Sequence, residues 1–359
     1  MNPVVLQENL NRAMGALTRV ANPKSPLPIA ATVLLETNNG RLVMRATNLD
    51  QSLTVTVGAM VAEEGAVAVD ARRFAEAIGN LPAVSLSLTL AGTQLVVEGG
   101  NANLRFPTMD ATDFPRGVDA EWGEAVEIPA VELRTVARSV GAAAAVDDSR
   151  PALTGIELQI VDGRRTWAAA DGFRLHVYGQ ASGERGVIIP ARALRMLSDM
   201  HGGGDPVSIQ FTGDRSRMRA TWGDHDFSTL AIQGTFPNYA QLIPSEARAT
   251  WEVDAQALLH AVRIARGFAD GIVRFRGAEG RIRVTGHGDD AGEGEATVEA
   301  AMRGEAGEQR FALNTRYAAD ALGAFTGVVT VESNGPSQQV VFRSESLTCV
   351  VMPMFVQER

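Results

Sequence analysis

The chain carries one pattern three times, and this repeat constrains the fold more than any other feature of the sequence. In each copy a helix-start residue precedes an arginine by two positions, and apolar residues at helical spacing follow; the starts are Asp70, Pro190 and Asn314. A second apolar stripe at helical spacing also occurs three times, within residues 6–20, 128–140 and 253–265. Asp and Asn cap helices and Pro suits a first helical turn, so the pattern predicts two helices in each of three units. The expected helices are 8–20, 70–81, 130–143, 190–200, 254–267 and 314–325.

Predicted hairpins lie between these helices. Residue pairs typical of tight hairpin turns, Asn39-Gly40, Asp162-Gly163 and Glu279-Gly280, each join two apolar segments. The segments are 31–37 with 41–46, 155–161 with 165–170, and 271–276 with 281–286. A further pair closes each repeat: 84–90 with 94–98, 207–211 with 218–222, and 328–332 with 339–342. Hairpins rather than βαβ crossovers predict an α+β fold, and Pro-punctuated joints divide it into residues 1–118, 119–245 and 246–359.

Composition excludes several classes of function. Cys349 is the only cysteine, so an intrachain disulfide and a cysteine-rich metal site are both excluded. Lys24 is the only lysine and does not follow glycine, which excludes a Walker-type phosphate loop. No motif indicates a catalytic centre, a cofactor or a metal site, and Asp224-His225-Asp226 is better explained as a solvated turn. The chain shows no apolar run that could span a membrane, and its start does not resemble a secretion signal, so we expect no membrane association and a cytoplasmic location.

Charge is unevenly distributed between the expected helices and the rest of the chain. The net charge is −9, yet the six expected helices carry eleven arginines against seven acidic residues. If these helices share one surface, that surface attracts phosphate while the rest of the protein repels it. Arginine is also a good helix former, so in a chain with one lysine the same excess has a purely structural explanation. Charge alone leaves both interpretations open.

Motifs along the whole chain resemble those of the bacterial β sliding clamps, the processivity subunits of DNA polymerase III. Each motif is weak by itself, but their order, their spacing and the threefold repeat make the set specific. The matching segments are SPLPIA at 25–30, ATNLD at 46–50, DFP at 113–115, SRPALTGI at 149–156, ADGFRL at 170–175, GTFPNY at 234–239, LIP at 242–244, NTRY at 314–317 and VVMPM at 350–354.

The resemblance implies a non-catalytic DNA sliding clamp. Clamps are head-to-tail homodimers that close a ring of six similar domains, with two helices per domain lining the hole and antiparallel sheets outside. Such a ring encircles double-stranded DNA without reading its sequence. It tethers the replicative polymerase subunit, the clamp loader and other proteins that carry a clamp-binding peptide. A divergent clamp paralogue that acts only as a protein-interaction hub is the alternative.

The resemblance also implies two sets of binding residues. A groove between the second and third domains takes the partner peptides, and the positions that match it, called the groove residues below, are Leu153, Gly172, Phe173, Arg174, Leu175, Pro237, Leu242, Asn314, Tyr317, Val350, Met352, Pro353 and Met354. The candidates for contact with DNA are two loop residues and the helix arginines: Lys24, Arg72, Arg73, Arg134, Arg138, Arg150, Arg192, Arg195, Arg263 and Arg266. Methionine suits a surface that must accept varied apolar anchors.

The expected dimer joins the first domain of one chain to the third domain of the other. We expect edge-strand pairing through residues 102–106, with Leu104 and Phe106 as apolar contacts and Ile264 and Phe268 as candidates on the third domain.

The chain departs from the family pattern at several of these places. Phe173 replaces the usual histidine, Ala170 a threonine, Gln241 a common arginine and Phe355 an arginine, and the loop 267–271 is short. These departures put peptide preference and ring stability in question.

Overall fold

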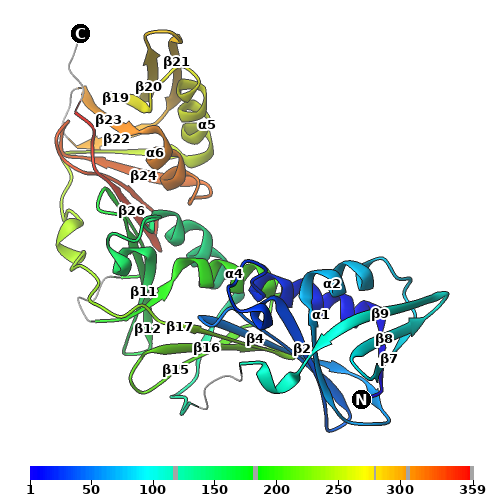
Figure 1. Cartoon of the computed structure of the whole chain (residues 1–359). Coiled ribbons are helices and arrows are strands. Elements are labelled where there is room, and N and C mark those ends of the chain that lie inside the picture. The colour runs from blue at the N-terminus through cyan, green and yellow to red at the C-terminus, as the bar shows by residue number, and fades with distance from the viewer. Residues whose placement is uncertain (116–119, 181–184, 279, 305–307, 356–359) are drawn as a thin grey trace. The chain divides into compact units, whose positions relative to one another are not determined.

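The computed structural model describes residues 1–115, 120–180, 185–278, 280–304 and 308–355. The chain forms two compact units, one made of Met1–Ala130 with Met196–Ala231 and the other of Val131–Arg195 with Ile232–Arg359. Each unit has its own antiparallel sheets (Figure 1). Among the described helices, none is long and apolar enough to cross a membrane.

The first unit is built on one antiparallel sheet of thirteen strands. Helix α1 (Gln7–Val20) packs against α2 (Ala71–Gly79) and against the sheet, where it buries Leu10, Met14 and Leu17. In spatial order the strands are β10 (Val126–Ile128), β15 (Val207–Phe211), β16 (Arg217–Trp222), β17 (His225–Leu230), β4 (Gln51–Gly58), β3 (Arg41–Thr47), β2 (Thr32–Asn38), β6 (Ala66–Asp70), β9 (Ala102–Met109), β8 (Gln94–Gly99), β7 (Ser85–Ala91), β1 (Pro3–Leu6) and β5 (Met60–Val61).

The second unit contains a nine-stranded and a four-stranded antiparallel sheet. The first has the order β14 (Val187–Pro190), β11 (Gly155–Val161), β12 (Arg164–Ala170), β13 (Arg174–Tyr178), β26 (Leu347–Val351), β25 (Val340–Arg343), β24 (Val328–Ser333), β18 (Ala249–Asp254) and β22 (Ala301–Gly304). The second has the order β21 (Gly292–Glu299), β20 (Arg281–Gly288), β19 (Ile272–Ala278) and β23 (Gln309–Asn314). Helix α5 (Ala255–Arg266) packs on the four-stranded sheet and on α6 (Thr315–Leu322).

The predicted turns and helix starts are confirmed where the structure describes them. Asn39 and Gly40 both have positive φ, as do Asp162 and Gly163, and each pair joins two strands. This is the geometry that a two-residue hairpin loop requires. Glu279, in the third turn, lies outside the described residues. The Asp70 carboxylate accepts a hydrogen bond from the Arg73 backbone N–H at 2.8 Å, and Asn314 caps α6 in the same way.

The expected helix 130–143 is correct in place but not in type. The α-helical part, α3 (Ala130–Thr135), gives way to a π-helical turn at Val136–Val140 and a short 3-10 turn at Gly141–Ala143. The carbonyl oxygen of Ser139, within the π turn, accepts a hydrogen bond from Nδ1 of the buried His176 at 2.6 Å. Single π turns of this kind occur inside α-helices, often at functional sites. This one contacts a residue far along the chain, which helical periodicity cannot reveal.

One kind of strand pairing occurs twice and joins successive repeats. In the first unit β4 pairs with β17, with His225 opposite Val55. In the second unit β13 pairs with β26, with Arg174 opposite Val351. In both cases the last strand of one three-stranded meander pairs with the last strand of a meander in the following repeat. The meanders are β2–β3–β4 with β15–β16–β17, and β11–β12–β13 with β24–β25–β26. Two further meanders, β19–β20–β21 and β7–β8–β9, end in strands that lack such a pairing. Among the described residues, β21 has one strand partner, β20, and the 102–107 part of β9 has one, β8.

Candidate functional site

A tight turn between β12 and β13 positions the middle of the groove residues. The Asp171 carboxylate accepts hydrogen bonds from the backbone N–H groups of Phe173 at 2.9 Å and Arg174 at 3.1 Å. Asp commonly stabilises turns in this way. Gly172 has φ +95°, a conformation that L side chains rarely adopt. The turn therefore projects Phe173 into solvent, where its side chain is 63% exposed, while Arg174 points inward.

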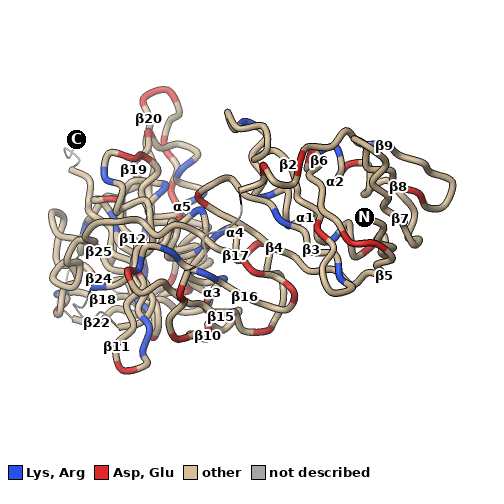
Figure 2. Tube along the Cα trace, turned by 60° about the horizontal axis from the view of Figure 1, so that its bottom comes forward, with Lys and Arg blue, Asp and Glu red and all other residues tan. Residues whose placement is uncertain are grey.

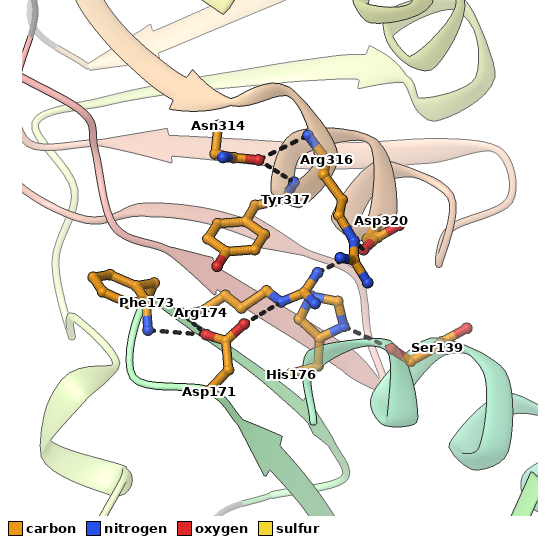
Figure 3. A network of polar contacts seen from close by, with 9 residues as sticks. All are labelled: Ser139, Asp171, Phe173, Arg174, His176, Asn314, Arg316, Tyr317 and Asp320. Carbon is orange, nitrogen blue, oxygen red and sulfur yellow. Dashed lines mark hydrogen bonds and ion pairs between the residues drawn. The ribbon is translucent and has the colours of Figure 1, made fainter. Parts of the chain in front are cut away.

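Arg174 is the centre of a buried polar network (Figure 3). Its guanidinium donates to Asp171 at 2.9 Å through Nε and to Asp320 of α6 at 2.6 Å through Nη1. The same group lies over the ring of Tyr317, 4.4 Å from its centroid. Burying an arginine costs free energy unless it is paired, and here two carboxylates and an aromatic face supply the compensation. Arg174 consequently joins β13 to α6 rather than offering a free positive charge.

His176 lies beneath this network and is fully buried. Burial, assisted by the nearby positive charge of Arg174, lowers its pKa to about 4, against the opposing effect of its hydrogen bond to Ser139. The imidazole is therefore neutral near pH 7 and donates through Nδ1. Burial and the Asp171 carboxylate also raise the pKa of Tyr317, which keeps the phenol neutral.

The groove residues divide into a buried and an exposed group. Leu153, Leu175 and Val350 are almost completely buried in a hydrophobic cluster that includes Phe236 and Tyr239. These three therefore form a support rather than a contact surface. The large apolar side chains that remain exposed are Phe173, Leu242, Met352 and Met354. Gly172 and Pro237 are also exposed, whereas Asn314, Tyr317 and Pro353 are half-buried.

Backbone hydrogen bonds hold the C-terminal segment, which carries Met352 and Met354, against Phe173 and β23. The Met352 N–H donates to the Phe173 carbonyl at 2.9 Å, and the Met354 N–H donates to the Ala312 carbonyl of β23 at 2.8 Å. Phe355 follows, and its side chain is 87% exposed. Exposed apolar side chains gathered in this way are typical of a protein-binding surface.

The candidate DNA-facing residues are surface groups with one exception. Arg134 is half-buried, and the other nine are exposed. The charges are marked along the chain in Figure 2. Arg150 lies close to the turn at Gly172, where a Cβ atom would come within 3.6 Å of its Nη1. The structure therefore places Arg150 beside the groove residues, which its position in the sequence did not reveal.

The candidate dimer residues differ in how much surface they offer. Ile264 and Phe268 are exposed, and Leu104 is half-buried. Phe106, in contrast, is buried in an edge-to-face contact with Phe74 of α2, with ring centroids 5.2 Å apart. Most of the apolar surface of Phe106 is therefore buried within its own chain.

Three family models match consecutive parts of the chain. They describe the N-terminal domain of the DNA polymerase III beta subunit over residues 1–118, its central domain over 127–238 and its C-terminal domain over 240–355. The chain belongs to the DNA polymerase III beta-subunit family. It is accordingly a processivity clamp with an α+β fold of three beta-clamp domains, and its role is non-catalytic.

Full-length relatives agree with this assignment. The chain is 28% identical to the beta sliding clamp of Synechococcus elongatus and 26% identical to that of Escherichia coli K12, over 99% of this chain and at least 99% of each relative. A crystal structure of the Pseudomonas aeruginosa sliding clamp bound to griselimycin has the same fold, with a TM-score of 0.92 at 24% identity, covering 99% of this chain and all of that one.

Sequence reasoning missed several residues that shape the site. Asp171 lay in a matching motif, but nothing in the sequence indicated that Asp320 would share Arg174 with it. His176 gave no signal, since a single histidine in an apolar strand has no distinctive spacing. Within the described residues no group of three or more His, Cys, Asp or Glu side chains could hold a metal ion. Asp226, in the candidate metal motif, instead forms an ion pair with Arg219.

Proposed function

We propose that the chain acts as a head-to-tail homodimeric ring that encircles duplex DNA in the cytoplasm. In this role it tethers the replicative polymerase, the clamp loader and other proteins that carry a clamp-binding peptide. The observation that carries the proposal is the twice-used strand pairing, β4 with β17 and β13 with β26. A third pairing of the same kind, β21 of one copy with β9 of another, would close a ring of two chains and six repeats.

The two strands left over support this closure. β21 and the 102–107 part of β9 each present one open edge among the described residues, and open edges pair readily with another chain. Leu104 on β9 and Phe268 beside β21 would supply apolar contacts. Gly294 of β21 lies so close to the Phe268 ring that any side chain there would collide with it. The division into domains 1–118, 119–245 and 246–359 forms part of this proposal.

Exposed arginines on the helices support contact with DNA. Arg72, Arg138, Arg195, Arg263 and Arg266 are all exposed and lie on helical segments. Arginines of this kind neutralise phosphates without reading base sequence, so the expected binding is weak and falls with salt concentration. A net charge of −9 keeps the remaining surface from holding DNA tightly.

The mass of the purified protein in solution tests ring closure. We expect a dimer by light scattering and a ring with a central hole by electron microscopy. Leu104→Lys places a charge on the open edge of β9 and should give a monomer. Met60→Lys, on the exposed edge strand β5 of the same sheet, is the matched control and should leave the dimer intact. A wild-type protein that stays monomeric at every practical concentration contradicts the proposal.

Reversing the charge of four helix arginines separates a clamp from an interaction hub. The variant carries glutamate at Arg134, Arg138, Arg192 and Arg195. Loss of DNA association with unchanged peptide binding supports the clamp. If DNA association does not change, the protein is instead a hub built on the clamp fold.

Peptide binding tests the exposed groove residues. The probe is a fluorescent peptide with leucine and phenylalanine anchors. Phe173→Ser and Met352→Ser should each weaken binding by about tenfold, because central apolar anchors carry most of the binding free energy at such surfaces. Val146→Ser removes an even more exposed apolar side chain that is not a groove residue and should have no effect. Equal affinity in all of these proteins contradicts the assignment of the groove residues.

A further inference from the structure

Four arginines gather on one face of the four-stranded sheet. Arg276 of β19 lies directly opposite Arg283 of β20 on one side and Arg310 of β23 on the other. Arg274 precedes Arg276 by two residues and therefore shares its face. The alternating residues Val273 and Phe275 are buried, so the arginines are on the face that points away from the core. We call Arg274, Arg276, Arg283 and Arg310 the arginine cluster.

The arginine cluster lines a cavity of about 760 Å³. Met354 and Phe355 of the C-terminal segment form an apolar part of its wall, and Glu293 and Glu295 of β21 also line it. Met354 belongs both to this cavity and to the groove residues. The cavity and the exposed apolar residues therefore share one stretch of chain, which the Met354 hydrogen bond ties to β23.

Neighbouring carboxylates satisfy only part of the cluster. Arg283 lies 3.4 Å from Glu295, and Arg310 forms an ion pair with Glu308. In the described part of the chain, the side chains of Arg274 and Arg276 make no hydrogen bond or ion pair with any residue. Like charges directly opposite one another on a sheet are destabilising. The row of arginines across the three strands therefore destabilises the sheet, and a bound anion would reduce the repulsion between them.

The pKa of Glu308 shows how the arginine cluster affects a nearby carboxylate. Its side chain is exposed, yet its hydrogen bond with Arg310 and the charges of Arg310, Arg276 and Arg283 hold its pKa below the usual value. A carboxylate from another molecule would meet the same field. Arginine suits this role because its planar fork can donate two hydrogen bonds to one carboxylate.

We propose that the arginine cluster binds an acidic segment of a partner protein next to the apolar anchors of that partner. The proposal rests on the proposed peptide binding and names the chemistry of the sequence that flanks the anchors. An acidic peptide fits the cavity better than nucleic acid does, because part of the cavity wall is apolar and a charged phosphate backbone gains nothing from apolar contacts. Met354 and Phe355 also offer contacts to the apolar side chains of a peptide.

A pair of matched peptides tests the proposal. The first carries only the leucine and phenylalanine anchors, and the second adds four glutamates through a short Gly-Ser linker, at either end in separate versions. We expect the better acidic version to bind about fivefold more tightly at low ionic strength, and the gain to shrink as salt screens the charges. The double variant Arg274→Gln/Arg276→Gln should lose this gain and keep its affinity for the anchor-only peptide.

Controls separate failure of this inference from failure of peptide binding itself. Arg164→Gln removes an exposed arginine at the start of β12, outside the arginine cluster, and should retain the full gain. The inference is overturned if glutamates at neither end of the peptide raise its affinity, or if the rise in affinity persists in the double variant.

If the anchor-only peptide does not bind at all, the proposal that the groove residues bind peptides fails. A free octaglutamate peptide then tests the cluster alone and must bind the wild type better than the double variant. Binding of an oligonucleotide instead of octaglutamate, sensitive to the same variants, also overturns the inference.

Discussion

Arg174 and Arg276 lie in the same compact unit and have opposite environments. Arg174 is buried, with two carboxylates and an aromatic ring around its guanidinium. Arg276 is exposed between two further arginines and makes no ion pair with a described residue. The charge of the first is paired with carboxylates within the fold, while the second has a charge available for another molecule. Burial and local partners, rather than residue type, thus decide whether an arginine supports the fold or can bind a ligand.

The contrast bears on how the two regions serve a clamp. The network around Arg174 fixes the turn that exposes Phe173 and connects it to α6, so it gives the groove residues a rigid base. Within the arginine cluster, Arg274 and Arg276 make no hydrogen bond or ion pair with a described residue, so their side chains can adjust to a bound ligand. If this contrast is correct, substitutions in the two regions will separate stability from binding.

The largest expected effect comes from Arg174→Ala. This change leaves Asp171 and Asp320 without their shared cation, and breaking a buried ion pair from one side costs about 3–5 kcal/mol. Urea or thermal unfolding would measure the loss. Arg316→Ala is the control, because Arg316 lies 3.7 Å from Asp320 with an exposed side chain and should cost less than about 1 kcal/mol. Similar losses in both variants would show that the Arg174 network is not the support inferred here.

Acid should weaken the same region through His176. In the unfolded chain the imidazole gains its proton near pH 6.5, whereas in the folded protein its pKa is about 4. Between these values the unfolded state binds more protons, so stability is lost as the pH falls through this window, by about 3 kcal/mol in total. Measuring unfolding at several pH values in wild type and His176→Asn should show a flatter dependence in the variant. His260→Asn makes the same substitution at an exposed histidine and is the matched control.

The smallest expected effect on stability belongs to the arginine cluster. Arg276→Ala should change the free energy of unfolding by no more than about 0.5 kcal/mol, because the side chain is exposed and makes no hydrogen bond with a described residue. Removing one of three adjacent like charges should, if anything, stabilise the sheet. A loss as large as that of Arg174→Ala would mean that Arg276 supports the fold as Arg174 does.

Local features of the fold were readable from the sequence. The hairpin turns at Asn39-Gly40 and Asp162-Gly163 and the helix cap at Asp70 depend on backbone preferences and hydrogen bonds within a few residues. The two helices per repeat follow from apolar periodicity, which reports the buried face directly. The groove residues came from motif resemblance, which gave their positions but not which of them are buried.

Only the tertiary structure decided the properties that depend on distant partners. Asp320 lies far along the chain from Arg174, and the π turn at Val136–Val140 meets His176 from another element. The arginine row requires the exact register of three strands, since a shift by one residue would turn Arg276 to the opposite face. Sequence by itself determined the repeated elements and the family, because these rest on local pattern. Burial, ion pairing and register were settled by packing between segments that are remote in the sequence.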